Sequence, residues 1–397
     1  MIRHYVFTVS RLFGAQRHPY LDIDTADWPS VTVLVPAHNE QAVIANALEA
    51  LLHVKYPLER LEIIPVNDRS TDRTREIIDS YASQYPDRIK PFHRTGGKPG
   101  KAAALKEVMA RLKSDVIVLF DADYIPAPDL IQRLVTPLFD PEIGAVMGRV
   151  VPLNVSTNLL TRLLDLERSG GYQVDQQARM NMNLVPQHGG TVGSVRMSAL
   201  NDCGGWNDDA LAEDTDLTFR LLLKGWKVAY QNRAECYEEV PETWNVRIKQ
   251  LIRWAWGHNQ VMLRYFWPVL TKSGLRLSER LDAILLLAVY ALAPMTLLGW
   301  ILALLAFYLG SGMMSGTVGL LALSCYAAVG NAAAFFELAS AVRLDGSRER
   351  VRLLPLNTLG FAVSVVCVLR AIWRHIKAHV QSSELVWDKT ERFRKAA

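Results

Sequence analysis

Two patterns of hydrophobic and polar positions divide the chain. In the first half, short apolar runs rich in Val, Ile and Leu alternate with longer stretches whose apolar positions recur every three or four residues. Runs of the first kind predict buried strands, and stretches of the second kind predict amphipathic helices. In the second half, no charged residue occurs from Ala283 to Phe336. The sequence therefore predicts an alternating α/β unit followed by a membrane region.

The α/β unit is expected to be an open, mostly parallel sheet with helices on both faces. The expected strands are 31–37, 61–68 and 115–123, with a weaker one in "IKPFHR" (89–94). The expected helices are 41–52, 70–85 and 100–113. Ligands of such sheets bind beyond the carboxyl ends of the strands. Polar residues follow three of these strand ends: His38, Asn39, Glu40, Asn67, Asp68, Asp121 and Asp123.

The uncharged segment 283–336 is long enough for two membrane crossings, since one crossing needs about 20 helical residues. "GSGMMSG" (310–316) is the expected turn between them. A third segment, 353–369, is uncharged but short and has basic residues on both sides. Cytoplasmic loops are the basic ones, so an interfacial or re-entrant segment fits better than a third crossing, which stays open. The expectation is a multi-pass membrane protein whose α/β unit is cytoplasmic.

Amphipathic stretches at 156–179 and 245–267 lie before the uncharged segment. Both predict helices that lie in the membrane interface, with their apolar faces in the acyl boundary. The N-terminal stretch 4–13 fits the same role, or a helix packed on the sheet. Four parts are therefore expected: an interfacial or packing segment (1–28), the α/β domain (29–244), interfacial helices (245–280), and a membrane region with a basic tail (281–397).

Composition excludes some classes of protein. The 397 residues carry a net charge of only +4, which does not indicate a nucleic-acid binder. The four cysteines form no CxxC pair, so neither a zinc site nor a disulfide framework is expected. The first 30 residues lack the apolar core of a signal peptide.

Two motifs suit the binding of a metal and of phosphates. In "FDAD" (120–123), Asp121 and Asp123 follow a buried strand, and such a pair suits Mg²⁺ or Mn²⁺ that also holds a substrate's phosphates. A solvated turn is the alternative. "GGKPGKAAAL" (96–105) is not a P-loop, because Ala102 follows Lys101 where the motif requires Ser or Thr. Lys98 or Lys101 could still lie against a diphosphate.

Two later motifs suit acid–base chemistry and ligand contact. Glu213, Asp214 and Asp216 begin a predicted helix, where carboxylates either offset the helix dipole or supply a general base. In "QLIRW" (250–254), the side chains of Gln250 and Trp254 share one helical face with Arg253, so they can meet a single ligand.

In chain order, these motifs resemble those of the family 2 glycosyltransferases. The resemblance rests on "VPAHNE", "VNDRSTD", "GKAAAL", "FDAD", "GSVR", "AED" and "QLIRW", and covers about residues 30 to 270. The similar branch is the membrane-embedded one, with cellulose, chitin and hyaluronan synthases and glycolipid glucosyltransferases; "WDKTER" (387–392) resembles its tail motif. Ala212 departs from the Thr often found there, Asn67 replaces a frequent acid, and N-terminal membrane helices are lacking.

The resemblance implies a GT-A fold and a UDP-sugar donor. Asp68 would contact the uracil or ribose, with Ala37 and Glu40 nearby. Asp121 and Asp123 would hold the nucleotide and a Mg²⁺ or Mn²⁺ ion, and Lys98 or Lys101 would lie near the nucleotide.

The same resemblance implies the catalytic roles. Asp214, beside Glu213, would be the general base, and an α-linked donor would give a β-linked product. Arg253 would neutralise charge on the departing diphosphate. Trp254 and Gln250 would contact the acceptor. His258, one turn further on, is expected to be a structural partner of its helix rather than a catalyst.

Three functions remain open from the sequence. The first is transfer to a growing β-linked polysaccharide or oligosaccharide, for which an oligomer or partner subunit would supply further membrane walls. The second is transfer to a membrane lipid. The third, of another class, is a non-catalytic membrane protein that binds nucleotide-sugars.

Overall fold

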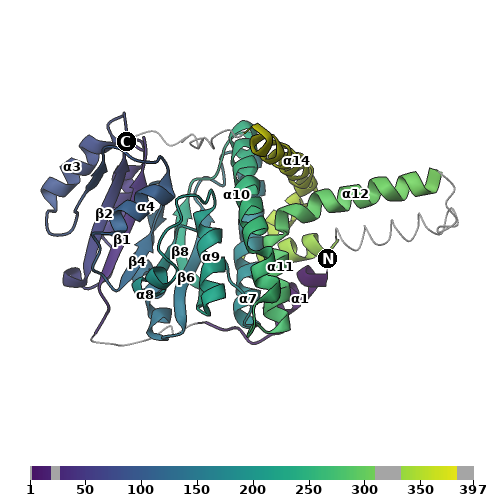
Figure 1. The fold of residues 1–397 in the computed structure, drawn as a ribbon, viewed down its shortest axis with the longest axis horizontal. Helices are drawn as coiled ribbons and strands as arrows, with labels where there is room; N and C mark the ends of the chain where they lie inside the picture. The colour runs from purple at the N-terminus through teal and green to yellow at the C-terminus, as the bar shows by residue number, and fades with distance from the viewer. Residues whose placement is uncertain (1, 19–26, 309–331, 382–397) are drawn as a thin grey trace.

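The computed structural model of the protein describes residues 2–18, 27–308 and 332–381. Within them, eight strands form one sheet in the order β3-β2-β1-β4-β7-β6-β8-β5 (Figure 1). The strands are β1 (Val31–Ala37), β2 (Leu61–Asp68), β3 (Phe92–Arg94), β4 (Val116–Leu119), β5 (Ile125–Pro126), β6 (Ile143–Pro152), β7 (Gly193–Arg196) and β8 (Lys227–Glu238).

The first half of the sheet is parallel, because β1 pairs in parallel with β2 and β4, and β2 with β3. Its strands are apolar on both faces: Val33 and Val35 of β1 pack into one hydrophobic cluster and Leu34 into another. β7 runs antiparallel to both β4 and β6, whereas β8 runs parallel to β6. The prediction of a mostly parallel α/β sheet is confirmed.

Helices cover the sheet on both faces and shape its binding edge. They are α2 (Ile44–Leu52), α3 (Thr74–Gln84), α4 (Lys101–Met109), α5 (Leu130–Val135), α8 (Met197–Asp202) and α9 (Glu213–Lys224), with short 3₁₀ turns at Leu58–Arg60 and Thr136–Phe139. The strand predicted at 115–123 is shorter, since β4 ends at Leu119. The amide of Asp121 instead donates to Thr191 Oγ1 at 3.0 Å, which takes this aspartate out of the ladder.

A second group of helices packs beside the sheet (Figure 1). They are α1 (Ile2–Phe13), α6 (Leu159–Ser169), the π-helical turn η3 (Gly170–Gln176), α7 (Gln177–Asn181), α10 (Trp244–Thr271), α11 (Leu277–Leu287), a helix whose described part covers 332–344, the 3₁₀ segment η4 (Arg348–Leu356) and α14 (Asn357–Gln381).

Protein covers a large part of the apolar faces of α6 and α10, and for that part it corrects the expectation that these faces lie in the acyl boundary; Leu159 of α6 and Leu263 and Trp267 of α10 remain exposed. Leu163 and Leu166 of α6 pack with Leu338 of the 332–344 helix. Leu251 and Ala255 of α10 belong to one buried cluster with residues of α14. The cause is the return of the C-terminal helices onto the α/β unit, which the local pattern does not encode. α1 likewise packs on α7, while its outer side chains Ile2, Val6, Val9 and Phe13 are exposed.

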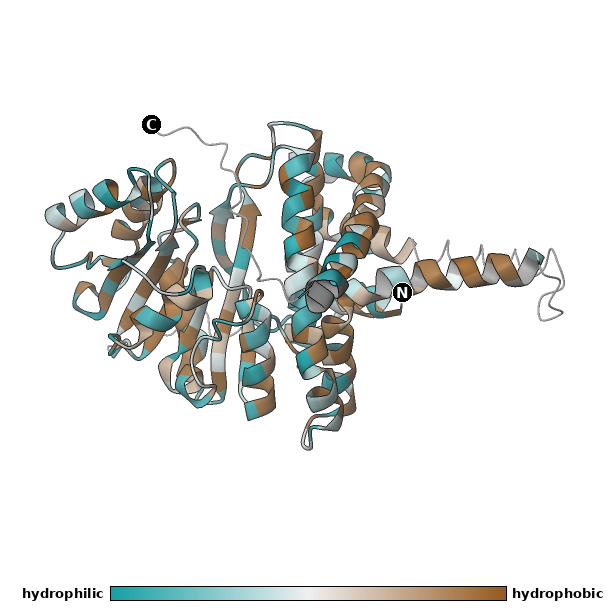
Figure 2. Cartoon of the chain, turned by 45° about the horizontal axis from the view of Figure 1, so that its top comes forward, coloured by the Kyte–Doolittle hydropathy of each residue, from teal (hydrophilic) through white to brown (hydrophobic). Residues whose placement is uncertain are grey.

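Helix α12 (Val289–Tyr308) projects from the body and is hydrophobic along most of its length (Figures 1 and 2). Among the described residues, one helical stretch, Glu349–Arg374, is long and apolar enough to cross a membrane by length and composition. It includes the segment for which the sequence favoured an interfacial or re-entrant position. The predicted turn at 310–316 and the "WDKTER" tail lie outside the described residues, so the multi-pass arrangement stays a prediction.

Candidate active site

One cavity of about 880 Å³ lies between the carboxyl edge of the sheet and the helices α10 and α14. Eleven of the residues singled out in the sequence line it: Ala37, Glu40, Asp68, Lys101, Asp121, Asp123, Glu213, Asp214, Gln250, Arg253 and Trp254. Of the two candidate lysines, Lys101 lies at the cavity, whereas the Nζ of Lys98 pairs with Asp209 on the surface at 2.5 Å. The motifs that the sequence spreads over more than two hundred positions therefore meet in one place.

At one end of the cavity, Asp68 closes β2 and is held by two fixed donors. Its Oδ1 accepts from the guanidinium of Arg94 at 2.7 Å, and its Oδ2 accepts from the amide of Gly100 at 3.1 Å. Arg94 is itself buried and paired with Glu107 at 2.8 Å. Because both carboxylate oxygens have partners, the orientation of Asp68 beside Ala37 and Glu40 is fixed.

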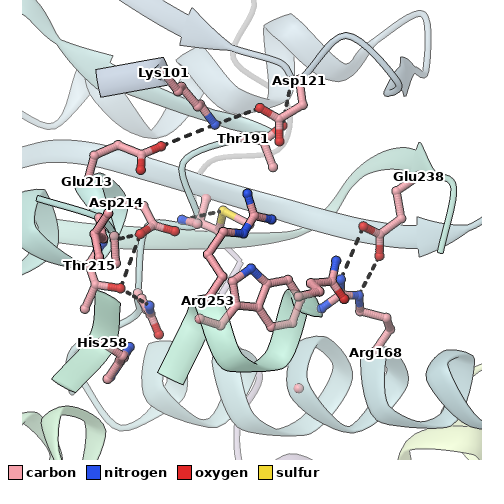
Figure 3. A pocket seen from close by; sticks show the side chains of 18 of the residues that line it. Lys101, Asp121, Arg168, Thr191, Glu213, Asp214, Thr215, Glu238, Arg253 and His258 are labelled. Atoms are coloured by element: carbon pink, nitrogen blue, oxygen red, sulfur yellow. Dashed lines mark hydrogen bonds and ion pairs between the residues drawn. The ribbon is translucent and has the colours of Figure 1, made fainter. Parts of the chain in front are cut away.

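Lys101 connects the aspartate pair with the start of α9. Its Nζ lies 2.7 Å from Asp121 Oδ1, 2.8 Å from the carbonyl oxygen of Gly190 and 3.4 Å from Glu213 Oε1 (Figure 3). Burial alone would lower the pKa of Lys101, but the carboxylates of Asp121 and Glu213 outweigh it and raise the pKa above its ordinary value. Lys101 is therefore a fixed ammonium between two groups of acids.

The loop 188–191 brings these groups together through a glycine. Gly190 has a φ of +69°, and a Cβ at this position would lie 2.9 Å from the Cβ of Asp214. Only glycine permits both the conformation and the close approach. The Oγ1 atom of the next residue, Thr191, accepts a hydrogen bond from the backbone amide of Asp121. The "GGT" of this loop thus joins β4 to α9, a role that the sequence did not reveal.

Asp214 and Glu213 are carboxylates with altered acidity. Asp214 Oδ1 accepts the amide of Thr215 at 2.6 Å, and both carboxylates line the cavity (Figure 3). Burial raises the pKa of Asp214 and that of Glu213 above their ordinary values, while the ammonium of Lys101 acts in the opposite direction. A raised pKa suits a group that exchanges a proton near neutral pH.

Helix α10 presents the "QLIRW" side chains to the same cavity. In the view of Figure 3, Arg253 extends from α10 between Asp214 and the pair formed by Arg168 and Glu238. The guanidinium carbons of Arg168 and Arg247 lie 5.4 and 5.3 Å from the ring centre of Trp254. These cation–π contacts orient the indole.

His258 also lines the cavity, one turn beyond Trp254, but its ring is engaged with helices. The Nε2–H donates to the carbonyl oxygen of Leu286 at 2.9 Å, and the ring meets Tyr290 edge-on. Burial lowers the pKa of His258. These contacts favour the structural role expected from the sequence.

Gly257 sets the distance between α10 and the acidic start of α9. A Cβ at Gly257 would lie 3.0 Å from both the Cβ and the backbone N of Ala212, the residue before Glu213. Glycine therefore lets α10 lie directly on the backbone that positions Asp214.

Several lining residues were missed. Arg168 pairs with Glu238 at 2.5 Å, and the hydroxyl of Tyr124 donates to the same carboxylate at 2.7 Å. Gly171 and Asp175 of η3 also line the cavity. Arg168, Gly171 and Asp175 lie within the amphipathic stretch 156–179, which was expected to lie in the membrane interface, and the sequence analysis assigned no role to Tyr124 or Glu238.

A mostly parallel α/β sheet, with paired aspartates beyond β4 and an acidic helix start facing them, defines the class of GT-A-like glycosyltransferases. Residues 29–257 match the family model described as "Glycosyltransferase like family 2", and the chain belongs to this family.

Two curated relatives and one solved structure place the chain within that family. It is 39% identical over 241 residues to a probable glycosyltransferase, YdaM, of Bacillus subtilis (strain 168), covering 60% of this chain and 57% of that protein. It is 34% identical over 274 residues to a beta-monoglucosyldiacylglycerol synthase of Synechocystis sp. (strain PCC 6803), covering 69% of this chain and 57% of that protein. The chain therefore spans less than two thirds of the length of either relative.

The fold is similar to that of the mannosyltransferase PcManGT from Pyrobaculum calidifontis, whose structure was solved in complex with GDP-Man and Mn²⁺. The TM-score is 0.58 at 22% identity, and the likeness covers 85% of this chain and 93% of that one. At this identity the likeness concerns the fold.

Proposed function

We propose that the protein transfers a sugar from a UDP-sugar to a hydroxyl group of a membrane lipid, with inversion at the anomeric carbon. The observation that carries the proposal is the composition of this cavity. One end is lined by the acids and Lys101 at the edge of the sheet, and the other end by apolar side chains of α11, α12 and α14. These are Leu286, Val289, Tyr290, Phe361, Val365 and Val368. The similarity to a beta-monoglucosyldiacylglycerol synthase agrees with such an acceptor.

The polar end suits a nucleotide with a metal ion. Among the described residues, no three His, Cys, Asp or Glu side chains form a metal cluster. Mg²⁺, however, is commonly bound by one or two protein carboxylates together with substrate phosphates. Asp121 and Asp123 fit that pattern and would hold the ion, which would neutralise phosphate charge. Asp68, Ala37 and Glu40 would then contact the nucleoside.

The reaction follows from the positions of the remaining groups. Asp214 takes the proton of the acceptor hydroxyl as its oxygen attacks the anomeric carbon, and the bond from that carbon to the diphosphate oxygen breaks. Arg253 and Lys101 supply positive charge on the side of the departing diphosphate, where fixed cations stabilise the transition state. Trp254 and Gln250 border the acceptor. Attack from the face opposite the diphosphate converts an α-linked donor into a β-linked product.

The pairing of charges favours an uncharged acceptor over a lipid phosphate. On the acceptor side, Arg168 pairs with Glu238 and Arg247 with Glu167. Arg179 pairs with Asp282 at 3.1 Å. A phosphate group that bound to one of these three guanidinium groups would have to break its ion pair, which costs free energy because a carboxylate would lose its partner. A lipid alcohol carries no charge, so its binding would leave these ion pairs intact.

Transfer to a growing polysaccharide is the second candidate. It rests on the "QLIRW" side chains, because an indole beside an amide suits a sugar ring as acceptor. It requires a polar conduit through the membrane, whereas the side chains that α12 and α14 contribute to the cavity include Val289, Phe361 and Val368.

The test uses the purified full chain in lipid nanodiscs with a panel of UDP-sugars and Mg²⁺ or Mn²⁺. Diacylglycerol and polyprenyl phosphate are added separately, and UDP release and lipid products are followed by mass spectrometry. We expect one UDP-sugar to give a glycosylated diacylglycerol. A glycosylated polyprenyl phosphate would overturn the uncharged acceptor, and long chains formed from UDP-sugar alone would establish the polysaccharide function instead.

A further inference from the structure

The α6–η3–α7 segment turns one continuous side toward the cavity. Glu167, Gly171, Asp175 and Arg179 follow each other at intervals of four residues, and all of them line it. On a regular α-helix, a spacing of four drifts by about 40° per step and would carry the last residue off this face. The π-helical turn Gly170–Gln176 widens the helix and compensates for this drift.

The two glycines at the start of this turn differ in what surrounds them. A Cβ at Gly170 would lie 2.6 Å from Leu338 Cδ2, so the Leu338 side chain packs directly against this glycine and would have to shift to admit a Cβ. A Cβ at Gly171 would meet nothing within 4 Å, although Gly171 lines the cavity. Packing does not explain the glycine at 171, and its missing side chain leaves room in the cavity.

The apolar wall opposite leads from the interior to the surface. Leu286 and Val368 line the cavity and are only 6% and 4% exposed. Val289 of α12 and Phe361 of α14 line the same cavity but are each 41% exposed. Val289 and Phe361 are thus partly exposed lining residues on two neighbouring helices, and α12 and α14 carry further exposed apolar side chains such as Leu302 and Leu359.

We propose that this part of the cavity is the acceptor subsite: the lipid enters sideways between α12 and α14, and Gly171 provides the room for its head group. The acyl chains then lie against Val289 and Phe361, and the hydroxyl reaches Asp214. This inference rests on the proposed transfer to a lipid and adds the route of the acceptor and the residue that limits its size.

The experiment replaces Gly171 with a residue whose side chain occupies the proposed subsite. Gly171→Leu places a branched side chain in the subsite, and steady-state kinetics with diacylglycerol in nanodiscs measure the effect. The matched control is Gly299→Leu, since Gly299 is a helical glycine of α12 with nothing within 4 Å of an added Cβ and does not line the cavity. UDP affinity, measured by calorimetry, reports whether the donor end is intact.

For Gly171→Leu we expect kcat/KM for the lipid to fall about tenfold or more, as for overpacking of a filled site, with UDP affinity within about twofold. Gly299→Leu should behave like the native chain. A second variant, Val289→Trp, narrows the opening and should raise KM for the lipid even if Gly171→Leu loses UDP binding through misfolding.

The outcomes separate the two proposals. If the native chain makes no glycolipid, both the function and the subsite are overturned. If the native chain makes glycolipid and a variant that binds UDP normally, at position 171 or 289, uses the lipid with native KM, the subsite alone is overturned.

Discussion

At the scale of single residues, the site depends on Lys101, whose ammonium lies between the acidic residues that follow β4 and those at the start of α9. Its ammonium contacts Asp121, which follows β4, and Glu213 of α9, and its positive charge lowers the pKa of Asp214 against the effect of burial. The ordering of the carboxylates and their protonation are therefore linked through one side chain.

Replacing Lys101 should move the acid limb of the pH profile. In Lys101→Met, burial still raises the pKa of Asp214 while the opposing positive charge is gone, so the pKa rises further. A general base with a higher pKa is protonated at higher pH, and the acid limb of kcat/KM should shift upward. Lys98→Met is the control, because Lys98 pairs with Asp209 on the surface. An unchanged or lower midpoint in Lys101→Met would contradict this coupling.

Two neighbouring carboxylates compete for the role of base, and substitution distinguishes them. Asp214→Asn should lower kcat by roughly 10²- to 10⁴-fold, the usual contribution of a general base. Glu213→Gln should cost less, because Glu213 is oriented toward Lys101. UDP affinity should stay close to native in both. A larger loss of kcat in Glu213→Gln than in Asp214→Asn would transfer the role to Glu213.

The sequence identified the residues whose position follows from strand order. Asp68 ends β2 and Asp121 follows β4, and both strands pair in parallel with β1, so their convergence follows from the sheet. Arg168, Glu238 and Gly171 could not be found in this way, because their place depends on how α6 and η3 pack against distant segments.

At the scale of elements, the contact of α10 with the start of α9 holds the site together. "QLIRW" supplies Arg253 and Trp254, but Gly257 decides how closely they approach Asp214. The pattern of the sequence predicted α10 and its cavity-facing side. It placed the apolar face in a membrane because α14, which covers it, begins about a hundred residues later.

A methyl group at Gly257 should separate these two helices. In Gly257→Ala, the added Cβ would lie 3.0 Å from backbone and side-chain atoms of Ala212, so α10 must shift. We expect a loss of about 1–3 kcal/mol in the free energy of unfolding, together with a lower kcat, measured by chemical denaturation and steady-state kinetics. Gly299→Ala adds the same group to α12 at a position where no atom of the described residues lies within 4 Å of the added Cβ, and should cost neither. Native kcat in Gly257→Ala would show that the helix contact does not position the base.

At the scale of the whole molecule, one cavity connects a polar sheet edge with apolar helices. The first half of the chain forms the α/β unit, and the second half supplies helices whose apolar side chains line the cavity at its binding edge. In the proposed function, a charged, water-soluble donor binds at the sheet edge while the lipid acceptor approaches along the apolar helices. Charged residues are frequent in the first half of the chain and absent from 283–336, and this pattern already predicted two different parts. The pattern did not predict that both parts would line the same cavity.

The anomeric configuration of the lipid product tests the central claim most directly. The full chain in nanodiscs containing diacylglycerol is given the α-linked UDP-sugar that supports UDP release, and the product is examined by NMR. The account predicts a single lipid glycoside in the β configuration, absent when Asp214→Asn replaces the native chain. An α-linked glycolipid, or sugar found only in polymer, would contradict it.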